Sequence, residues 1–153
     1  PDLIDAVFAL GGEADLVRLL ARVAALQEFV MMEDGANLIT GYRRAANILK
    51  IEEKKDKKSY TEPVRAEKLH LPEEKVLADS LAAAQGLIAA GLKSEDFKHA
   101  MSAMAGLRKA VDAFFDKVTV NAEDQEERAN RLRLLAAIRG AMDQVADFSK
   151  IEG

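Results

Sequence analysis

The sequence predicts an all-helical fold, a single bundle of five to six helices. Apolar residues recur at spacings of three and four, which is the period of an amphipathic helix. Apolar types make up 49% of the 153 residues, much of this share being alanine, whereas aromatic residues reach only 5%. Such a composition favours closely packed helices over sheets, which draw on β-branched and aromatic side chains. The one β-type run, Val118-Thr119-Val120, is too short to build a sheet.

The first half of the chain predicts three helices. A short helix over residues 2–10 is followed by Gly11-Gly12, which closes it. The second helix is recognised by its periodic apolar residues Leu16, Leu19, Leu20, Val23, Leu26 and Val30. Asp34-Gly35 marks the turn into a third helix, whose buried stripe is expected to comprise Leu38, Tyr42, Ala45 and Leu49. This third helix is expected to end in the charged, solvated residues 52–58.

A long internal loop is expected within residues 55–71. Residues 59–71 have no apolar period and contain Pro63, and clusters of this kind are typical of loops. Pro72 with the acidic residues behind it then begins a fourth helix, because proline is favoured in the first helical turn. This fourth helix is expected to end near Gly91.

Two further helices complete the predicted bundle. Ser94-Glu95-Asp96 caps the fifth, whose apolar residues are Phe97, Met101, Met104, Leu107, Val111 and one of Phe114 and Phe115. The last helix begins around residues 121–124 and has the apolar residues Leu132, Leu135, Ile138, Met142 and Val145. All six helices fit one domain over residues 1–153, which we expect to be a piece of a longer protein because it lacks an initiator methionine.

Positive charge is concentrated in one part of an acidic chain. The net charge is −4, which argues against indiscriminate nucleic-acid binding. Residues 41–58, however, contain seven basic and three acidic residues, a local charge of +4, so the rest of the chain carries −8. A basic strip on an acidic body suits docking on one part of an RNA while the remainder is repelled.

The sequence contains no recognisable catalytic or metal-binding motif. Without cysteine, neither a disulfide framework nor a thiolate metal site can form. A glycine-rich phosphate loop, G-x-S-x-G, H-E-x-x-H and a calcium loop are all missing. His70 and His99, the only histidines, have no carboxylate set at ligand spacing and are interpreted as surface or loop residues. We therefore assign no catalytic residue, no metal and no cofactor to this chain.

The sequence gives a weaker indication of where the protein works. The first ten residues lack the pattern of a signal peptide, and the apolar residues 81–92 are too few to span a bilayer. The missing cysteine is compatible with a reducing compartment. A cytoplasmic protein without a membrane role is expected.

A basic row on the third helix is the first candidate site. Residues 43, 47, 50 and 54 are spaced four, three and four apart, so they line one face beside the apolar stripe. Side chains with several N–H donors, such as the bidentate guanidinium and amide groups, can contact phosphates and base edges. The alternative is an ordinary solvated basic face, which periodicity alone favours. Tyr42 lies at the apolar stripe and is expected in the core.

The second candidate region joins the fifth and sixth helices. Neighbouring residues on a helix point about 100° apart, so Phe114 and Phe115 cannot both face one core and one of them should be partly exposed. In the last helix, Arg128 and Arg131 lie on the same side as apolar residues. They must either pair with acids, forming a structural salt bridge, or point into a cleft that contacts RNA.

Several of these segments resemble the DALR-type anticodon-binding domain of tRNA synthetases. One is Tyr42-Arg43-Arg44-Ala45-Ala46-Asn47-Ile48-Leu49, and another is Ala110-Val111-Asp112-Ala113-Phe114-Phe115-Asp116-Lys117-Val118. Together with Asn121-Ala122-Glu123-Asp124, Asn130-Arg131-Leu132 and Val145-Ala146-Asp147-Phe148-Ser149, they are similar to the C-terminal end of the bacterial glycyl-tRNA synthetase β subunits. The family often has proline where this chain has Ala110, and methionine where it has Thr119. The resemblance extends over essentially the whole chain.

The resemblance implies a role in reading the anticodon of glycine tRNA. It implies an α subunit as partner, in an α2β2 enzyme that uses ATP and Mg²⁺ elsewhere to make glycyl-tRNA, while this chain alone is not catalytic and binds no DNA. The anticodons of glycine end in two cytosines, which a carboxylate or carbonyl acceptor beside Arg, Asn or Lys donors could read. Unpaired bases also stack on aromatic or guanidinium planes. The tRNA-binding residues that we predict on this basis are Arg43, Arg44, Asn47, Lys50, Lys54, Phe115, Arg128, Asn130 and Arg131.

Two alternatives remain open from the sequence. The chain could be a purely structural helical module that holds subunits together, with its basic strip exposed for no purpose. It could also be the same type of domain from another synthetase, such as an arginyl enzyme, whose C-terminal motifs fit this sequence less well. Salt-dependent binding of tRNA would distinguish the structural module from the RNA-binding domain.

Overall fold

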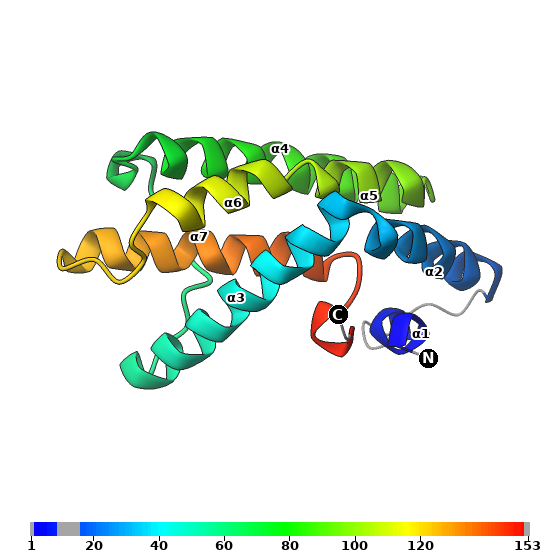
Figure 1. Cartoon of the computed structure of the whole chain (residues 1–153), viewed down its shortest axis with the longest axis horizontal. Coiled ribbons are helices and arrows are strands. Elements are labelled where there is room, and N and C mark those ends of the chain that lie inside the picture. Colours follow the sequence, from blue (N-terminus) through cyan, green and yellow to red (C-terminus); the bar gives the residue numbers. More distant parts are fainter. Residues whose placement is uncertain (1, 9–15, 152–153) are drawn as a thin grey trace.

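The computed structural model describes residues 2–8 and 16–151, and this part of the chain is helical without a β-strand (Figure 1). The predicted all-helical fold is therefore confirmed. The α-helices of the described residues are α1 (Asp2–Phe8), α2 (Leu16–Met31), α3 (Glu33–Asp56), α4 (Pro72–Lys93), α5 (Phe97–Ala105), α6 (Arg108–Lys117) and α7 (Gln125–Asp143). Two 3-10 turns, η1 (Ala66–Lys68) and η2 (Phe148–Lys150), complete the described structure. The predicted closing turn at Gly11-Gly12 lies outside the described residues.

Helix α7 forms the centre of the bundle. It packs against α3 on one side and α4 on another, and α6 and α5 lie along α4 (Figure 1). Its apolar residues are fully buried on several sides, including Leu132, Leu134, Leu135, Ile138 and Met142. A helix that is surrounded in this way has few positions left for solvent, so even its charged residues must find partners inside the protein.

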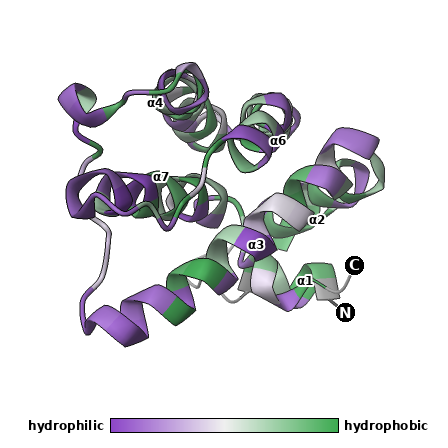
Figure 2. Cartoon of the chain, turned by 60° about the vertical axis from the view of Figure 1, so that its left-hand side comes forward, coloured by the Kyte–Doolittle hydropathy of each residue, from purple (hydrophilic) through white to green (hydrophobic). Residues whose placement is uncertain are grey.

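Helix α3 crosses the bundle diagonally, and its C-terminal end projects beyond the other helices (Figures 1 and 2). The predicted stripe of Leu38, Tyr42, Ala45 and Leu49 is buried. Asp34-Gly35, predicted as a turn, lies instead in the first turn of α3. A Cβ on Gly35 would lie 1.8 Å from the backbone oxygen of Phe29, so only glycine lets α3 begin this close to the end of α2. The helix also continues past Glu52 to Asp56, where Lys57 takes a left-handed φ of 55°.

The segment between α3 and α4 is irregular except for the single turn η1. Residues 55 and 56 of the expected loop belong to α3, so the irregular segment covers residues 57–71. It runs from the projecting end of α3 back to the start of α4, passing the N-terminal half of α7. Its path therefore depends on polar contacts with α7, which are described below.

The predicted fifth helix is divided into α5 and α6. Asp96 caps α5 as expected, its side chain accepting a hydrogen bond from the backbone N–H of His99 at 3.1 Å. Gly106 and Leu107 form the break between the two helices, and glycine has a low propensity for a helix interior. The break turns α6 onto α3, where a Cβ on Gly41 would lie only 2.8 Å from Cγ1 of Val111.

Helix α4 is longer than the apolar stretch that the sequence indicated. With 22 residues it is long and apolar enough, by length and composition alone, to cross a membrane. Its Leu77, Leu81, Ala84 and Ile88 nevertheless belong to the same core as α7. The capped start is as predicted, with Pro72 in the first turn and Glu74 accepting from the backbone N–H of Leu71 at 3.3 Å. We assign α4 to the bundle.

Candidate nucleic-acid interface

The outer face of α3 carries exposed polar side chains in a continuous row. Opposite the buried stripe, residues at spacings of three and four form what we call the α3 outer face: Thr40, Arg44, Asn47, Ile51, Lys54 and Lys55. All six are exposed, and Ile51 exposes 65% of its surface. The face therefore combines hydroxyl, guanidinium, amide and ammonium donors with one apolar side chain.

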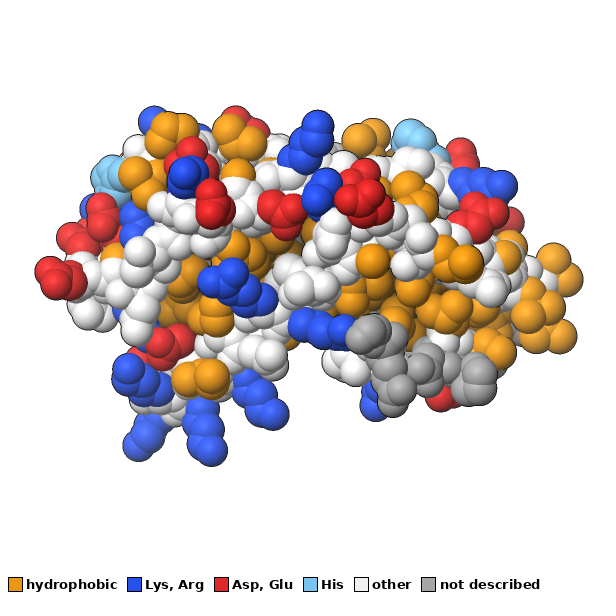
Figure 3. Space-filling view, viewed as in Figure 1, with side chains coloured by type: hydrophobic (Ala, Val, Ile, Leu, Met, Phe, Trp, Pro, Cys, Tyr) orange, Lys and Arg blue, Asp and Glu red, His pale blue; other side chains and the backbone are white. Residues whose placement is uncertain are grey.

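The face ends in a group of exposed lysines at the projecting end of α3, which we call the lysine tip. It comprises Lys50, Lys54, Lys55, Lys57 and Lys58. Figure 3 shows Lys and Arg side chains gathered at the lower left, where the end of α3 projects in Figure 1. Among the described residues, Asn47, Lys50 and Lys54 form no ion pair or hydrogen bond through their side chains. Cations in this state keep their charge available for phosphates.

Arg43 does not belong to this face. Its guanidinium donates to the backbone oxygen of Ile151, which lies just after η2. Its position is half-buried, one residue before the exposed Arg44. Arg43 has the predicted helical spacing to Asn47, Lys50 and Lys54, but its guanidinium is engaged by the C-terminal turn that docks on α3 at this point.

Phe115 is the exposed member of its pair, as one of the two had to be. Phe114 is fully buried, whereas Phe115 is half-buried and meets it edge-on at a centroid distance of 5.7 Å. The guanidinium carbon of Arg44 lies 4.5 Å from the centroid of the Phe115 ring. The cation and the aromatic ring attract each other, so Arg44 is held across the gap between α3 and α6.

A hollow of about 450 Å³ opens beside this stack. We call it the α3–α6 hollow, and its lining residues are Asn37, Thr40, Gly41 and Arg44 from α3 with Arg108, Asp112, Phe115 and Asp116 from α6. Arg108 forms an ion pair with Asp112 at 2.8 Å, and its guanidinium donates to Asp34 at 3.3 Å. Two arginines and two aspartates balance inside the hollow, so it differs in charge from the lysine tip.

Arg128 is engaged inside the protein. It is 7% exposed, and its guanidinium lies 2.8 Å from Asp56 and 3.3 Å from Glu52, both on α3. It also donates to the side-chain oxygen of Asn121 at 2.7 Å and to the Tyr60 hydroxyl at 3.4 Å. Hydrogen bonds from Tyr60 and then Arg128 lower the pKa of Asp56. These contacts tie the end of α3 and the start of the loop to α7.

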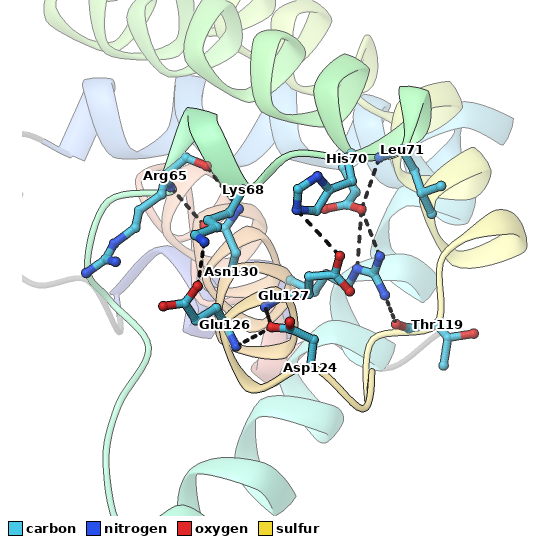
Figure 4. Close-up of polar contacts among 11 residues, drawn as sticks. Arg65, Lys68, His70, Leu71, Thr119, Asp124, Glu126, Glu127 and Asn130 are labelled. Atoms are coloured by element: carbon cyan, nitrogen blue, oxygen red, sulfur yellow. Dashed lines mark hydrogen bonds and ion pairs between the residues drawn. The ribbon is translucent and has the colours of Figure 1, made fainter.

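Asn130 and Arg131 are engaged in the same way (Figure 4). The Asn130 side chain accepts from the backbone N–H of Arg65 at 2.8 Å and donates to its carbonyl at 3.1 Å, as a neighbouring strand would. Arg131 pairs with the fully buried Glu74 at 3.0 Å and donates to the carbonyl of Thr119 at 2.7 Å. In this structure the alternative of a structural salt bridge holds for Arg128 and Arg131. Neither they nor Asn130 join the α3 outer face.

Of the predicted residues, Phe115 contacts Arg44, and the exposed side chains along α3 are those of Arg44, Asn47, Lys50 and Lys54. The remaining ones are held by partners within the protein: Arg43, Arg128, Asn130 and Arg131. Sequence reasoning did not select the polar lining of the α3–α6 hollow. Arg108, Asp112 and Asp116 are spaced at four and four, so a polar face of α6 was visible. What the sequence lacked was the partner helix, since nothing in the spacing of α6 says that it packs on α3.

A match to a family model settles the family of this fold. The model of the DALR anticodon binding domain matches residues 38–152, which include the whole of α4 to α7 and most of α3. The chain belongs to the DALR anticodon binding domain family. In this family member, the α3 outer face and the α3–α6 hollow both lie largely within the matched residues.

Curated relatives of this DALR domain align with nearly its whole length. It is 60% identical to the glycine–tRNA ligase β subunit of Rhodospirillum centenum and 52% identical to that of Phenylobacterium zucineum, over 99% of this chain in both cases. The corresponding protein of Ruegeria sp. is 45% identical. The chain spans about a fifth of the length of these curated relatives, 21% and 22% for the first two. The predicted resemblance is confirmed.

Proposed function

We propose that this DALR domain binds the anticodon stem-loop of glycine tRNA as part of a glycine–tRNA ligase β subunit. The observation that carries the proposal is the exposed α3 outer face, which runs from the α3–α6 hollow to the lysine tip within a domain of the anticodon-binding family. The hollow offers hydrogen-bonding groups and a stacked guanidinium, and the tip offers exposed cations. Together these suit a loop that presents bases and a backbone that presents phosphates.

The charge distribution supports one direction of approach. The projecting end of α3 is positive, whereas the rest of the chain carries an excess of acidic residues. A field of this kind draws a polyanion toward the tip and repels it from the body. From Arg44 to Lys54 the helix rises by about 15 Å at 1.5 Å per residue, a length that several nucleotides of a loop can follow.

The rest of the relatives' length leaves room for the functions that this chain does not show. We infer that a separate α subunit activates glycine with ATP and Mg²⁺, and that it docks on those other parts in an α2β2 assembly. The names of the relatives support the ligase activity of the whole protein. A cytoplasmic location follows from a role in translation. The chain alone should then support no glycine-dependent ATP–pyrophosphate exchange, and measurable exchange by the pure chain would contradict this division of roles.

Binding of the chain to glycine tRNA at several salt concentrations tests the proposal. The Lys54→Ala/Lys55→Ala variant should bind more weakly, and the slope of log affinity against log salt should fall by about one unit for each phosphate that a lysine no longer neutralises. The matched control is Lys75→Ala/Lys93→Ala, which removes the same charge from exposed positions of α4. The control should bind as the parent chain does.

Two results would overturn parts of the proposal. If the tip variant and its control bind equally well, the lysine tip is an ordinary solvated surface. If the parent binds no tRNA, or binds equally well to a tRNA whose two anticodon cytosines are replaced, the chain does not read the anticodon. If it binds no tRNA at all, the structural module is the better interpretation.

A further inference from the structure

The α3–α6 hollow differs from the rest of the α3 outer face in shape and in charge. Gly41 forms its floor, where α3 approaches Val111 of α6 so closely that a Cβ would lie 2.8 Å from it. Its volume of about 450 Å³ lies at the lower end of the range of about 300–1,000 Å³ that is typical of small-molecule sites. The hollow is open to solvent, and its volume is sufficient for one small group such as a nucleobase.

The charges within the hollow favour a neutral occupant. Arg44 and Arg108 are matched by Asp112 and Asp116, and Arg108 already pairs with Asp112 at 2.8 Å. A phosphate in the hollow would lie close to two carboxylates, which would repel it. The lysine tip at the end of α3 provides cations instead, and the α3 outer face carries no acidic residue. A neutral base can enter the hollow, and the phosphates beside it can lie along α3.

One end of the hollow provides a stacking surface. The guanidinium of Arg44 is held 4.5 Å from the centroid of Phe115. Unpaired bases are bound by stacking on guanidinium planes and aromatic rings, which is a sequence-tolerant source of affinity. Because Phe115 and Arg44 come from different helices, the stack exists only where α3 and α6 meet.

The hydrogen-bonding groups of the hollow distinguish among bases. The carboxylate of Asp112 is occupied by Arg108, whereas Asp116 is exposed and pairs with the neighbouring Lys117 at 3.6 Å, too long for a hydrogen bond. A carboxylate with oxygens still able to accept can bind the amino group of cytosine. Uracil presents a carbonyl oxygen in the same place, so the carboxylate would repel it. Asn37 and Thr40 also line the hollow and supply an amide and a hydroxyl, and the hydroxyl already donates to the carbonyl of Ala36 at 3.2 Å.

We propose that the α3–α6 hollow is a cytosine-selective subsite, in which Asp116 accepts from the base amino group and the Arg44–Phe115 stack holds the base plane. The proposal rests on the proposed function, since it assigns to this hollow one of the two anticodon cytosines of glycine tRNA. The remainder of the loop lies along Asn47 and the lysine tip. Asp116 is the residue that determines specificity, and Arg44 and Phe115 contribute affinity for any base.

Binding to anticodon stem-loop RNAs tests this assignment. The RNAs are the parent loop and two variants in which one or the other cytosine is replaced by uracil. The parent chain should prefer cytosine by about tenfold to a hundredfold at one of the two positions, the usual range for one base-edge contact. Asp116→Asn should lose most of this preference, because an amide can donate to uracil as well as accept from cytosine.

The control is Asp79→Asn, the same change on α4, outside the hollow. It should retain the preference, and circular dichroism should show unchanged helix content for both variants. If Asp116→Asn keeps the full preference at both positions while the lysine-tip variant still loses affinity, the subsite is wrong and the proposed function stands. A parent chain that binds the RNAs without distinguishing cytosine from uracil overturns the subsite together with the reading of the anticodon. A parent chain that binds none of these RNAs overturns the proposed function itself.

Discussion

The α3 outer face and the N-terminal half of α7 use the same residue types in opposite ways. On α3, Arg44 and the lysine tip face solvent with few partners, whereas on α7 Arg128 and Arg131 are buried and held by acids from α3 and α4. An exposed cation costs the fold little and remains available to a ligand. A buried cation must be neutralised by its own protein. Burial, rather than residue type, therefore distinguishes the α3 outer face from the buried arginines of α7.

The largest expected effect comes from removing a buried arginine. Arg131→Ala leaves Glu74 fully buried without its cation, and breaking a buried pair in this way costs about 3–5 kcal/mol. Urea denaturation followed by circular dichroism should show a much lower midpoint. Arg44→Ala, the exposed counterpart, should stay within about 0.5 kcal/mol of the parent. Equal effects of the two substitutions would abolish the contrast between the regions.

An intermediate effect is expected at the contact between α3 and the end of α7. The Tyr42 hydroxyl donates to Asp143 at 2.9 Å, and burial together with this hydrogen bond raises the pKa of Tyr42. Tyr42→Phe removes the donor while keeping the ring, so it should lower the free energy of unfolding by about 1–2 kcal/mol. Tyr60→Phe, whose hydroxyl donates to Asp56 at 2.6 Å, allows a direct comparison in the same assay. If Tyr42→Phe leaves the free energy of unfolding unchanged, a water molecule replaces the missing donor to Asp143.

A smaller effect should appear with pH at the Arg128 contacts. Hydrogen bonds from Tyr60 and Arg128 lower the pKa of Asp56 below its value in the unfolded chain, near 3.8. The stabilisation is therefore complete above that value and is lost as the pH falls through the lower folded pKa. The melting temperature of the parent should fall more steeply than that of Asp56→Asn between about pH 5 and pH 2. Parallel curves would show that Asp56 is not coupled to folding.

The sequence was sufficient for features that depend on a helix alone. The helical period placed Tyr42 and Leu49 in the core, and the angle between neighbours required Phe114 and Phe115 to differ in exposure. The break between α5 and α6 was missed because the apolar residues continue across it, with Leu107 and Met104 both buried. Gly106 alone did not predict a break, because the helical spacing of the apolar residues continues on both sides of it.

Features that depend on distant partners could not be predicted. Arg131 and Glu74 are 57 positions apart, and Arg128 and Tyr60 are 68 apart, so only the packing of α7 on α3 and α4 reveals that they meet. The contact of Arg43 could not be predicted for the same reason, since its acceptor at Ile151 lies 108 positions away. A periodic pattern gives the direction of a side chain around its helix, but it does not say whether solvent or another segment occupies that side.

The contacts of Arg128 also have a mechanical consequence. The C-terminal end of α3 projects from the bundle, and an RNA bound to its lysines would pull this end away from α7. Glu52 and Asp56 lie on the inner side of the projecting end, where Arg128 holds them to α7. These two ion pairs therefore hold the end of α3 to the central helix α7, and they oppose its displacement although its outer side is exposed.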